Sequence, residues 1–206
     1  MRLWIALPRQ QRHIDPAFAH HGDLPVIEDG LARITVVVGE HAGQRSPAAV
    51  YSPLVGLEVA FGESGRVTLP ATSGFEYGVL SADGPASVSC AASAASASTP
   101  PTIIAPGQLA HLPAGVPSLT ISAPGPSRFF VVGGVPFGEK LVMWWNFVAR
   151  AAEEISSARE AWRNGEFGEV PGYPGEPLAA PPLPPGTLKA RWRSRAGMTD
   201  RGDRSR

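Results

Sequence analysis

The sequence contains one cysteine, Cys90, among its 206 residues. A single cysteine excludes an internal disulfide and a zinc site made of several thiolates, and we expect Cys90 to be a small buried apolar residue. No apolar run approaches the roughly 18 residues of a transmembrane helix. The N-terminal sequence MRLWIALPRQQRH also has too short an apolar run for a secretory signal. These absences favour a cytoplasmic protein that does not insert into a membrane.

Neither sign of charge predominates, because Lys plus Arg and Asp plus Glu both number 18. A neutral chain has no overall electrostatic attraction to nucleic acid or to an acidic membrane, so we expect neither as a partner. The sequence also lacks the Gly-rich phosphate loop, the G-x-S-x-G elbow and the C-x-x-C pair that mark several enzyme classes.

Histidine pairs at the spacing of metal ligands, H-x-H or H-x3-H, are absent too. His20 and His21 are neighbours in a polar arm, and they would point apart in an extended chain. We predict that His13 and His41 are loop residues and that His111 is an ordinary half-buried histidine of a strand.

Glycine and proline are frequent, with 23 and 22 residues, and they separate many short apolar segments. This pattern predicts about ten short strands with no helix among them, as in a sandwich, a jelly roll or a barrel. Residues 10–25 form a polar arm in this interpretation, and AASAASAS (91–98) forms a loop between two strands. The predicted strands are 2–8, 32–40, 54–62, 65–70, 75–84, 86–92, 102–105, 108–114, 118–124 and 128–134.

The C-terminal third has a different pattern. LVMWWNFVA (141–149) is aromatic and β-branched, which predicts one strand that is covered on both faces. EEISSAREAWRNG (153–165) predicts a helix, because two glutamates lie in its first turn and its apolar residues form one stripe. That stripe consists of Ile155, Ala158 and Trp162. The proline-rich segment from Pro171 predicts an extended chain that leads into an arginine-rich solvated end.

The stretch VVGGVPFGEKLVMWWNFVARAAEEISSAREAW (131–162) resembles the C-terminal region of the pirin family. RLWIALPRQ (2–10) resembles the segment that follows the first domain of pirins, and FGEV (167–170), PPLP (181–184) and LKAR (188–191) fit the bacterial branch. The resemblance extends over nearly the whole chain. It implies an all-β fold, a cupin-type double-stranded β-helix or jelly-roll barrel, with one C-terminal α-helix at 151–164.

Pirins consist of two cupin domains, of which the first carries a metal, usually iron, on His and Glu ligands. By this resemblance, residues 1–30 are an inter-domain segment and arm, 31–170 are a metal-less cupin barrel with its helix, and 171–206 are a tail. The iron domain would then lie upstream of residue 1. Three interpretations stay open: a fragment, a start codon set too late, and a true half-length protein.

The second cupin motif, G-x5-P-x-G-x2-H-x3-N, keeps its turn residues in this chain but not its ligand. The turn residues are Gly107, Pro113 and Gly115. Ser118 stands at the histidine position and Ser122 at the asparagine position.

The first cupin motif, G-x5-H-x-H-x3,4-E-x6-G, is framed by Gly65 and Gly84. Ala71 and Ser73 stand at its histidine positions, and Tyr77 stands at its glutamate position. A mononuclear iron oxygenase typically uses two imidazoles and a carboxylate. We therefore predict no metal site, no cofactor and no catalytic residue in this chain, and iron only in the upstream domain that the resemblance implies.

Three functions stay open on this basis. The chain is a non-catalytic cupin that acts as a binding or interaction module, the C-terminal half of a pirin-type quercetin 2,3-dioxygenase, or a remnant that folds poorly by itself. By resemblance, the tryptophans near the junction of the two pirin domains form exposed apolar surface here. We therefore predict self-association or a protein partner at an interface that includes Trp4, Trp144 and Trp145.

Overall fold

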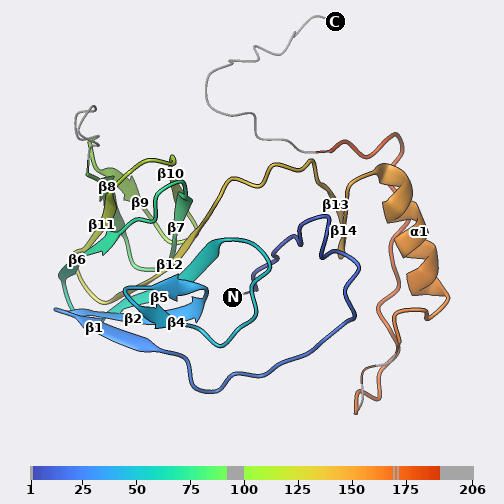
Figure 1. Cartoon of the computed structure of the whole chain (residues 1–206), viewed down its shortest axis with the longest axis horizontal. Helices are drawn as coiled ribbons and strands as arrows, with labels where there is room; N and C mark the ends of the chain where they lie inside the picture. Colours follow the sequence, from blue (N-terminus) through green and yellow to red (C-terminus); the bar gives the residue numbers. More distant parts are fainter. Residues whose placement is uncertain (1, 92–99, 169, 171, 191–206) are drawn as a thin grey trace, which may run out of the picture. The chain divides into compact units, whose positions relative to one another are not determined.

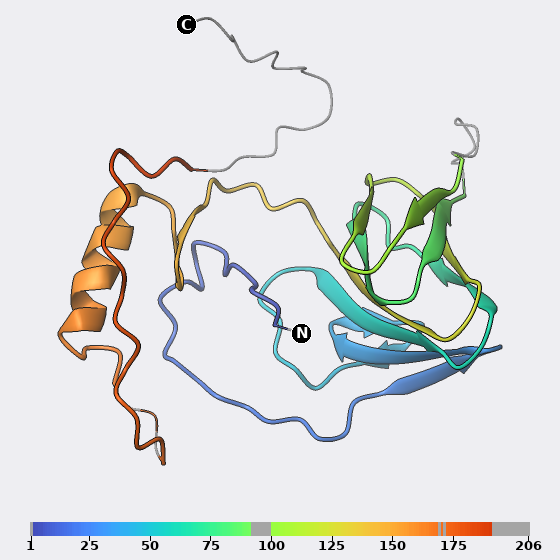
Figure 2. The ribbon, with the colours of Figure 1, turned by 180° about the vertical axis from the view of Figure 1, so that it is seen from behind.

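The computed structural model describes residues 2–91, 100–168, 170 and 172–190. The chain divides between Phe137 and Gly138 into two compact units. We call residues 1–137 the barrel unit and residues 138–206 the C-terminal unit, and we describe each by itself (Figures 1 and 2). The loop predicted at 91–98 and the arginine-rich end of the chain lie almost entirely outside the described residues.

The barrel unit consists mainly of two antiparallel sheets (Figure 1). The larger sheet has the strand order β1-β2-β5-β12-β7-β10, and the smaller one has the order β6-β11-β8-β9. The strands of the larger sheet are β1 (Val26–Asp29), β2 (Ala32–Val38), β5 (Leu54–Phe61), β7 (Glu76–Asp83), β10 (Leu109–Leu112) and β12 (Ser127–Gly134). Those of the smaller sheet are β6 (Gly65–Pro70), β8 (Ala86–Cys90), β9 (Thr102–Ile104) and β11 (Ser118–Ala123). This architecture confirms the predicted all-β cupin fold.

Alternating side chains build the core between the two sheets. In β2, the sequence ARITVVV buries every second residue from Ala32 to Val38, because successive side chains of a strand point to opposite faces. The buried residues of both sheets form one mainly aliphatic cluster that contains Ile34, Leu69, Ile121 and Phe129. Full burial of each such side chain contributes about 1.5–3 kcal/mol, so the two-sheet core provides the main stabilisation of this unit.

Residues 2–8 do not form the predicted strand. Apolar and β-branched composition favours an extended chain, but a strand also requires a neighbour that pairs with its backbone N–H and C=O groups. The sequence signal could not show that the sheets leave this segment unpaired.

The prediction also missed three short strands. Besides β1, these are β3 (Glu40–His41) and β4 (Gln44–Arg45), which form a hairpin with a two-residue turn. Its turn residues Ala42 and Gly43 have φ values of 47° and 76°, the left-handed conformation that suits a tight hairpin. The prediction of His41 as a loop residue was therefore wrong, because His41 is the last residue of β3.

In the C-terminal unit, the single strand predicted at 141–149 is instead a hairpin of β13 (Val142–Trp144) and β14 (Phe147–Ala149). Trp145 and Asn146 form its turn, and Trp145 has a φ of 49°. A positive φ is uncommon for a residue other than glycine, which explains why composition did not predict a turn here. The prediction of one strand covered on both faces was accordingly wrong.

The predicted helix is confirmed as α1 (Ala152–Arg163). Its Glu154 carboxylate accepts hydrogen bonds from the backbone N–H groups of Arg150 (2.7 Å) and Ala151 (3.3 Å) at the helix start. A glutamate at the third helical position commonly stabilises a helix in this way. Ile155 is 0% exposed and contacts the residues of the β13–β14 hairpin. Among the described residues, no helix has the length and apolar character needed to cross a bilayer.

Candidate functional site: a pocket at one end of the barrel

The positions of the cupin metal ligands lie at one end of the barrel. Ala71 directly follows β6, and its N–H donates to the carbonyl oxygen of Pro117 at 2.9 Å. Ser118 begins β11 opposite Pro70, the last residue of β6. Tyr77 lies near the start of β7 and is 4% exposed. Ser73 is instead an exposed residue of the turn before β7.

The side chains at these positions do not match the ligand set of an iron site. The Ala71 side chain has no atom that can bind a metal, and the Tyr77 hydroxyl accepts a hydrogen bond from the Thr72 N–H at 2.7 Å. Glu76, the neighbour of Tyr77, lies 3.4 Å from the Nε2 atom of His111 in the next strand. No group of three or more His, Cys, Asp and Glu side chains that could hold a metal occurs within the described ranges. Two imidazoles and a carboxylate therefore do not converge at these positions.

The turn residues of the second motif surround β10. Gly107 precedes this strand with a φ of 82°, and its N–H donates to the Ser81 carbonyl oxygen at 2.8 Å. Gly115 follows the strand with a φ of 95°. Both values lie in the left-handed region where a side chain is unfavourable, which explains glycine at these two positions.

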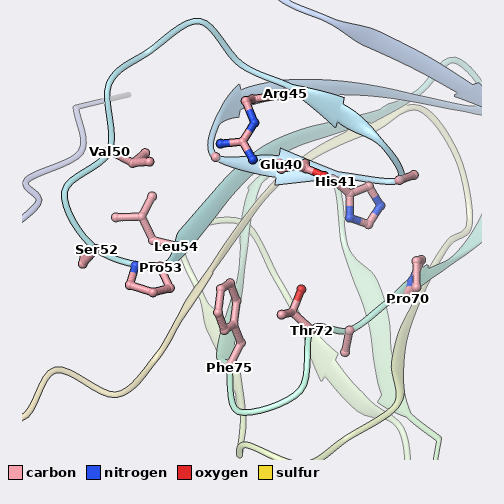
Figure 3. Close-up of a pocket in the computed structure, with 13 residues that line it drawn as sticks. Glu40, His41, Arg45, Val50, Ser52, Pro53, Leu54, Pro70, Thr72 and Phe75 are labelled. Carbon is pink, nitrogen blue, oxygen red and sulfur yellow. Dashed lines mark hydrogen bonds and ion pairs between the residues drawn. The ribbon is translucent and has the colours of Figure 1, made fainter.

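A pocket of about 410 Å³ lies next to Ala71, at the same end of the barrel (Figure 3). The elements around it are the β3–β4 hairpin, the chain that leads into β5, and the connection from β6 to β7. Its lining residues are Gly39, Glu40, His41, Ala42, Arg45, Val50, Ser52, Pro53, Leu54, Pro70, Ala71, Thr72 and Phe75. Figure 3 shows the labelled side chains arranged around a common space.

The polar side of this pocket comes mainly from the β3–β4 hairpin. The Arg45 guanidinium donates to a Glu40 carboxylate oxygen at 2.5 Å. Burial lowers the pKa of His41 below the ordinary value of a histidine, because desolvation disfavours the charged imidazolium. The sequence prediction did not assign a function to any of these three residues. The dipeptide Ala42-Gly43, between the polar pairs 40–41 and 44–45, was the sequence feature that could have indicated a hairpin here.

The predicted interface residues have different environments in the two units. Trp4 is 45% exposed in the barrel unit. Trp144 and Trp145 are partly buried in the C-terminal unit, where they belong to a set of contacting rings that we call the aromatic cluster. Its members are Trp144, Trp145, Phe147, Trp162 and Phe167, with centroid distances of 5.4–6.5 Å between contacting rings.

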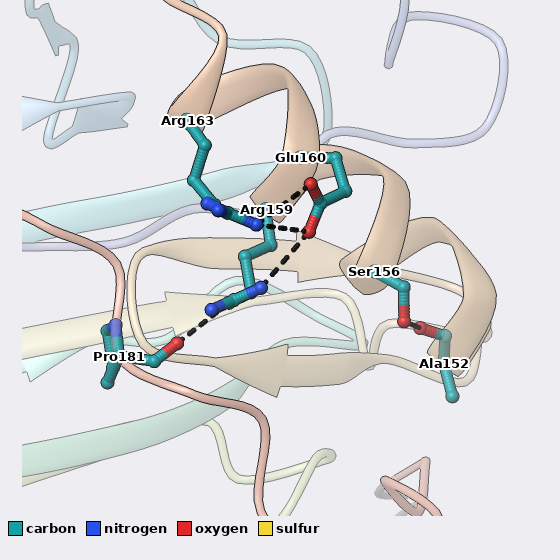
Figure 4. Close-up of polar contacts among 6 residues, drawn as sticks. All are labelled: Ala152, Ser156, Arg159, Glu160, Arg163 and Pro181. Carbon is teal, nitrogen blue, oxygen red and sulfur yellow. Dashed lines mark hydrogen bonds and ion pairs between the residues drawn. The ribbon is translucent and has the colours of Figure 1, made fainter.

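The proline-rich segment of the C-terminal unit lies along α1. The indole N–H of Trp162 donates to the Leu178 carbonyl oxygen at 2.7 Å. The Nε–H group of Arg159 donates to the Pro181 carbonyl oxygen at 2.8 Å, as Figure 4 shows. A proline-rich extended chain forms no regular ladder of backbone hydrogen bonds, so its carbonyl oxygens need other donors. Two side chains of α1 provide such donors here.

Two further predictions concern Cys90 and His111. Cys90 contacts the barrel core, but it is partly buried rather than buried as predicted. The His111 side chain is 37% exposed and lies in β10. Neither residue lines the pocket next to Ala71.

These features together define a cupin-type barrel. The positions that the motif spacing predicts for metal ligands carry Ala71, Ser73, Tyr77 and Ser118. Residues 56–168 match the family model of the pirin C-terminal cupin domain. The chain therefore belongs to the pirin family, and it contains the C-terminal cupin of that family.

Proteins similar to this chain carry two kinds of name. The chain is 37% identical over 185 residues to "Putative quercetin 2,3-dioxygenase PA1205" of Pseudomonas aeruginosa. The alignment covers 89% of the chain and 55% of that protein. It is 29% identical to a "Pirin-like protein" of Caulobacter vibrioides, over 81% of the chain and 54% of that protein. The chain thus spans about half the length of the curated relatives it matches.

One solved structure has a similar fold. The crystal structure of quercetin 2,3-dioxygenase from Acinetobacter baumannii superimposes with a TM-score of 0.78 and 36% sequence identity. The match covers 91% of this chain and 59% of that structure.

Proposed function

We propose that this cupin is non-catalytic and acts as a binding or interaction module. The observation that carries the proposal is the set of residues at the cupin ligand positions: Ala71, Ser73, Tyr77 and Ser118. A pocket of about 410 Å³ at the same end of the barrel supports a binding role, because its volume is typical of sites for small molecules. A cytoplasmic location is part of this proposal.

The chemistry of dioxygen explains why these residues argue against catalysis by this domain. An iron centre supplies open coordination positions, and the protein must hold it through several strong ligands on one face. At the ligand positions the chain offers a methyl group, two serine hydroxyls and a tyrosine hydroxyl that already accepts the Thr72 N–H. This domain therefore contributes a shaped surface rather than a reaction centre.

The test is metal content together with turnover. Purified chain is analysed for iron, nickel and zinc after mild chelation, and quercetin oxidation is followed with and without added iron. We expect well below one metal per chain and no metal-dependent turnover. One tightly held metal per chain, or turnover by protein free of contaminating enzyme, would contradict the proposal.

The alternative is that the chain is the C-terminal half of a quercetin 2,3-dioxygenase whose iron domain lies upstream. The names of two relatives at 37% and 36% identity favour it, as does their greater length. The discriminating observation is the nucleotide sequence upstream of Met1. An in-frame segment with an H-x-H pair, together with quercetin turnover by the extended protein, would support this alternative.

A protein partner or self-association through exposed apolar surface remains part of the proposal. Leu3, Trp4 and Ile5 are 40%, 45% and 48% exposed, so they form an adjacent apolar group on the N-terminal segment. Trp4→Ser should reduce association in light scattering, whereas Trp144→Ser should instead destabilise the aromatic cluster. A wild-type chain that is monomeric at high concentration, with no gain in solubility from Trp4→Ser, would exclude this interface.

A further inference from the structure

Several side chains that line the pocket next to Ala71 have N–H or O–H groups that no described acceptor of the protein uses. The Thr72 hydroxyl and the His41 ring have no hydrogen-bond partner among the residues that the structure describes, and both line the pocket. Figure 3 shows the Thr72 hydroxyl pointing toward the hairpin that carries His41 and Arg45. The Arg45 guanidinium has five N–H donors, and its ion pair with Glu40 does not use all of them. A ligand rich in acceptor atoms would satisfy these groups.

The lining has no net charge at pH 7, and His41 is the one ionisable side chain among the described lining residues that belongs to no ion pair. The ionisable side chains of the lining are Glu40, His41 and Arg45, and the walls from β5 and from the β6–β7 connection add none. The Glu40 and Arg45 charges compensate each other, and His41 is neutral at pH 7 because burial lowers its pKa. A bound carboxylate would favour the protonated imidazole, so that the uptake of one proton would balance its charge.

The remainder of the lining is apolar. Val50, Pro53, Leu54 and Phe75 lie across the pocket from His41 in Figure 3. Val50 is 37% exposed and Phe75 is 8% exposed, so the apolar wall extends from the rim to the barrel core. A ligand that fits must therefore combine an acceptor group with an apolar body.

We propose that this pocket binds a small amphipathic monocarboxylate. The carboxylate lies between the Arg45 guanidinium, the His41 ring and the Thr72 hydroxyl, and the apolar body contacts Val50, Leu54 and Phe75. This inference rests on the proposed binding role and names the ligand class for it. Charge-assisted hydrogen bonds provide the selectivity, since they are about twice as strong as neutral ones.

The test is isothermal titration of the full chain with 3-phenylpropanoate and with its neutral amide as the matched probe. We expect the carboxylate to bind at least about fivefold more tightly than the amide at pH 6, because a hydrogen bond to a charged group contributes more. The carboxylate should also bind more tightly at pH 6 than at pH 8. Its binding heat should depend on the buffer, since complex formation takes up a proton.

Two substitutions of opposite effect distinguish this site from a general effect on structure. Arg45→Gln should weaken carboxylate binding about tenfold, because it removes a charged donor and leaves the Glu40 charge near the ligand. Glu40→Gln should strengthen binding, because it removes that negative charge and makes the Arg45 donors available. The control is Arg33→Gln on the exposed ion pair with Glu28 in the same unit, and it should change nothing.

His41→Gln and Thr72→Val complete the set. His41→Gln should remove the pH dependence, and Thr72→Val should weaken carboxylate binding while the backbone contact with Tyr77 remains. Equal affinities for carboxylate and amide, an undiminished affinity in Arg45→Gln, or no binding at millimolar concentration would overturn the inference. Absence of binding in a metal-free, inactive chain would leave the non-catalytic assignment intact, whereas metal-dependent quercetin turnover would contradict that assignment whatever the titration shows.

Discussion

The barrel unit and the C-terminal unit are stabilised by different kinds of core. The barrel core is mainly aliphatic, and its side chains alternate along strands of two facing sheets. The buried core of the C-terminal unit consists of Val142, Phe147, Ala149 and Ile155. Partly buried tryptophans, together with Ala158 and Leu188, pack against this smaller core.

The difference shows how the size of a unit determines the residues that it needs. Two sheets enclose residues from both sides, so side chains of moderate size are fully buried there. A hairpin and one helix enclose little volume, and large rings then provide contact area even when they remain partly exposed. The indole N–H groups can also reach polar partners at the edge, as Trp162 does with the Leu178 carbonyl.

The largest effect that we predict concerns the barrel core. Phe129→Ala removes a side chain that is 0% exposed and contacts the Phe61 ring at a centroid distance of 6.3 Å. The loss should be about 3–5 kcal/mol in the free energy of unfolding, measured by urea denaturation. The matched control is Phe18→Ala, since Phe18 is 93% exposed and should cost almost nothing. Equal effects for both variants would contradict the burial of Phe129 in the two-sheet core.

The next effect concerns the core of the C-terminal unit. Ile155→Ala should cost about 2–3 kcal/mol, because Ile155 is 0% exposed and the small core has few neighbours that can fill the cavity. Amide hydrogen exchange in α1 should accelerate. Leu178→Ala, at a residue that is 71% exposed, serves as the control. If exchange in α1 stays unchanged in Ile155→Ala, the aromatic rings rather than the aliphatic residue stabilise this unit.

A smaller effect should distinguish the contribution of the Trp162 ring packing from that of its indole hydrogen bond. Trp162→Phe keeps a ring in the aromatic cluster but removes the donor to the Leu178 carbonyl. The expected loss is about 1 kcal/mol, and trypsin should cleave after Lys189 faster because the proline-rich segment is held less firmly. Trp4→Phe is the control at an exposed tryptophan. Unchanged cleavage in Trp162→Phe would show that this hydrogen bond does not hold the segment.

The smallest effect concerns the polar hairpin of the barrel unit. Burial lowers the pKa of His41 in the folded state, so the unfolded state binds more protons as the pH falls through the unfolded pKa of about 6.5. Folding stability should therefore decrease from pH 7.5 to pH 5, and His41→Gln should reduce that decrease. His13→Gln, at an exposed position of the N-terminal arm, is the control. A pH dependence identical in wild type and His41→Gln would exclude this contribution.

The sequence allowed the barrel strands to be predicted where alternation and turn residues agreed. The predicted strand 65–70 coincides with β6, and the strand 54–62 differs from β5 by one residue. The segment 2–8 failed because pairing with a neighbour, rather than composition, makes a strand. The segment 141–149 failed because its turn uses Trp145 at a positive φ instead of glycine.

For the candidate site, too, one part could be predicted from the sequence and another part could not. The motif spacing placed Ala71, Tyr77 and Ser118 at ligand positions, and the fold brings these three to one end of the barrel. The pocket had no comparable signal, because His41 and Thr72 are separated by 31 positions and belong to no spacing pattern.

The sequence by itself determined the all-β class, which depends on local alternation and glycine turns. Its resemblance to pirins gave the cupin fold, the family and the residue types at the expected ligand positions. Only the tertiary structure decided which polar groups meet beside Ala71. The β3–β4 hairpin brings His41 and Arg45 toward the β6–β7 connection, and long-range packing between these segments creates the pocket.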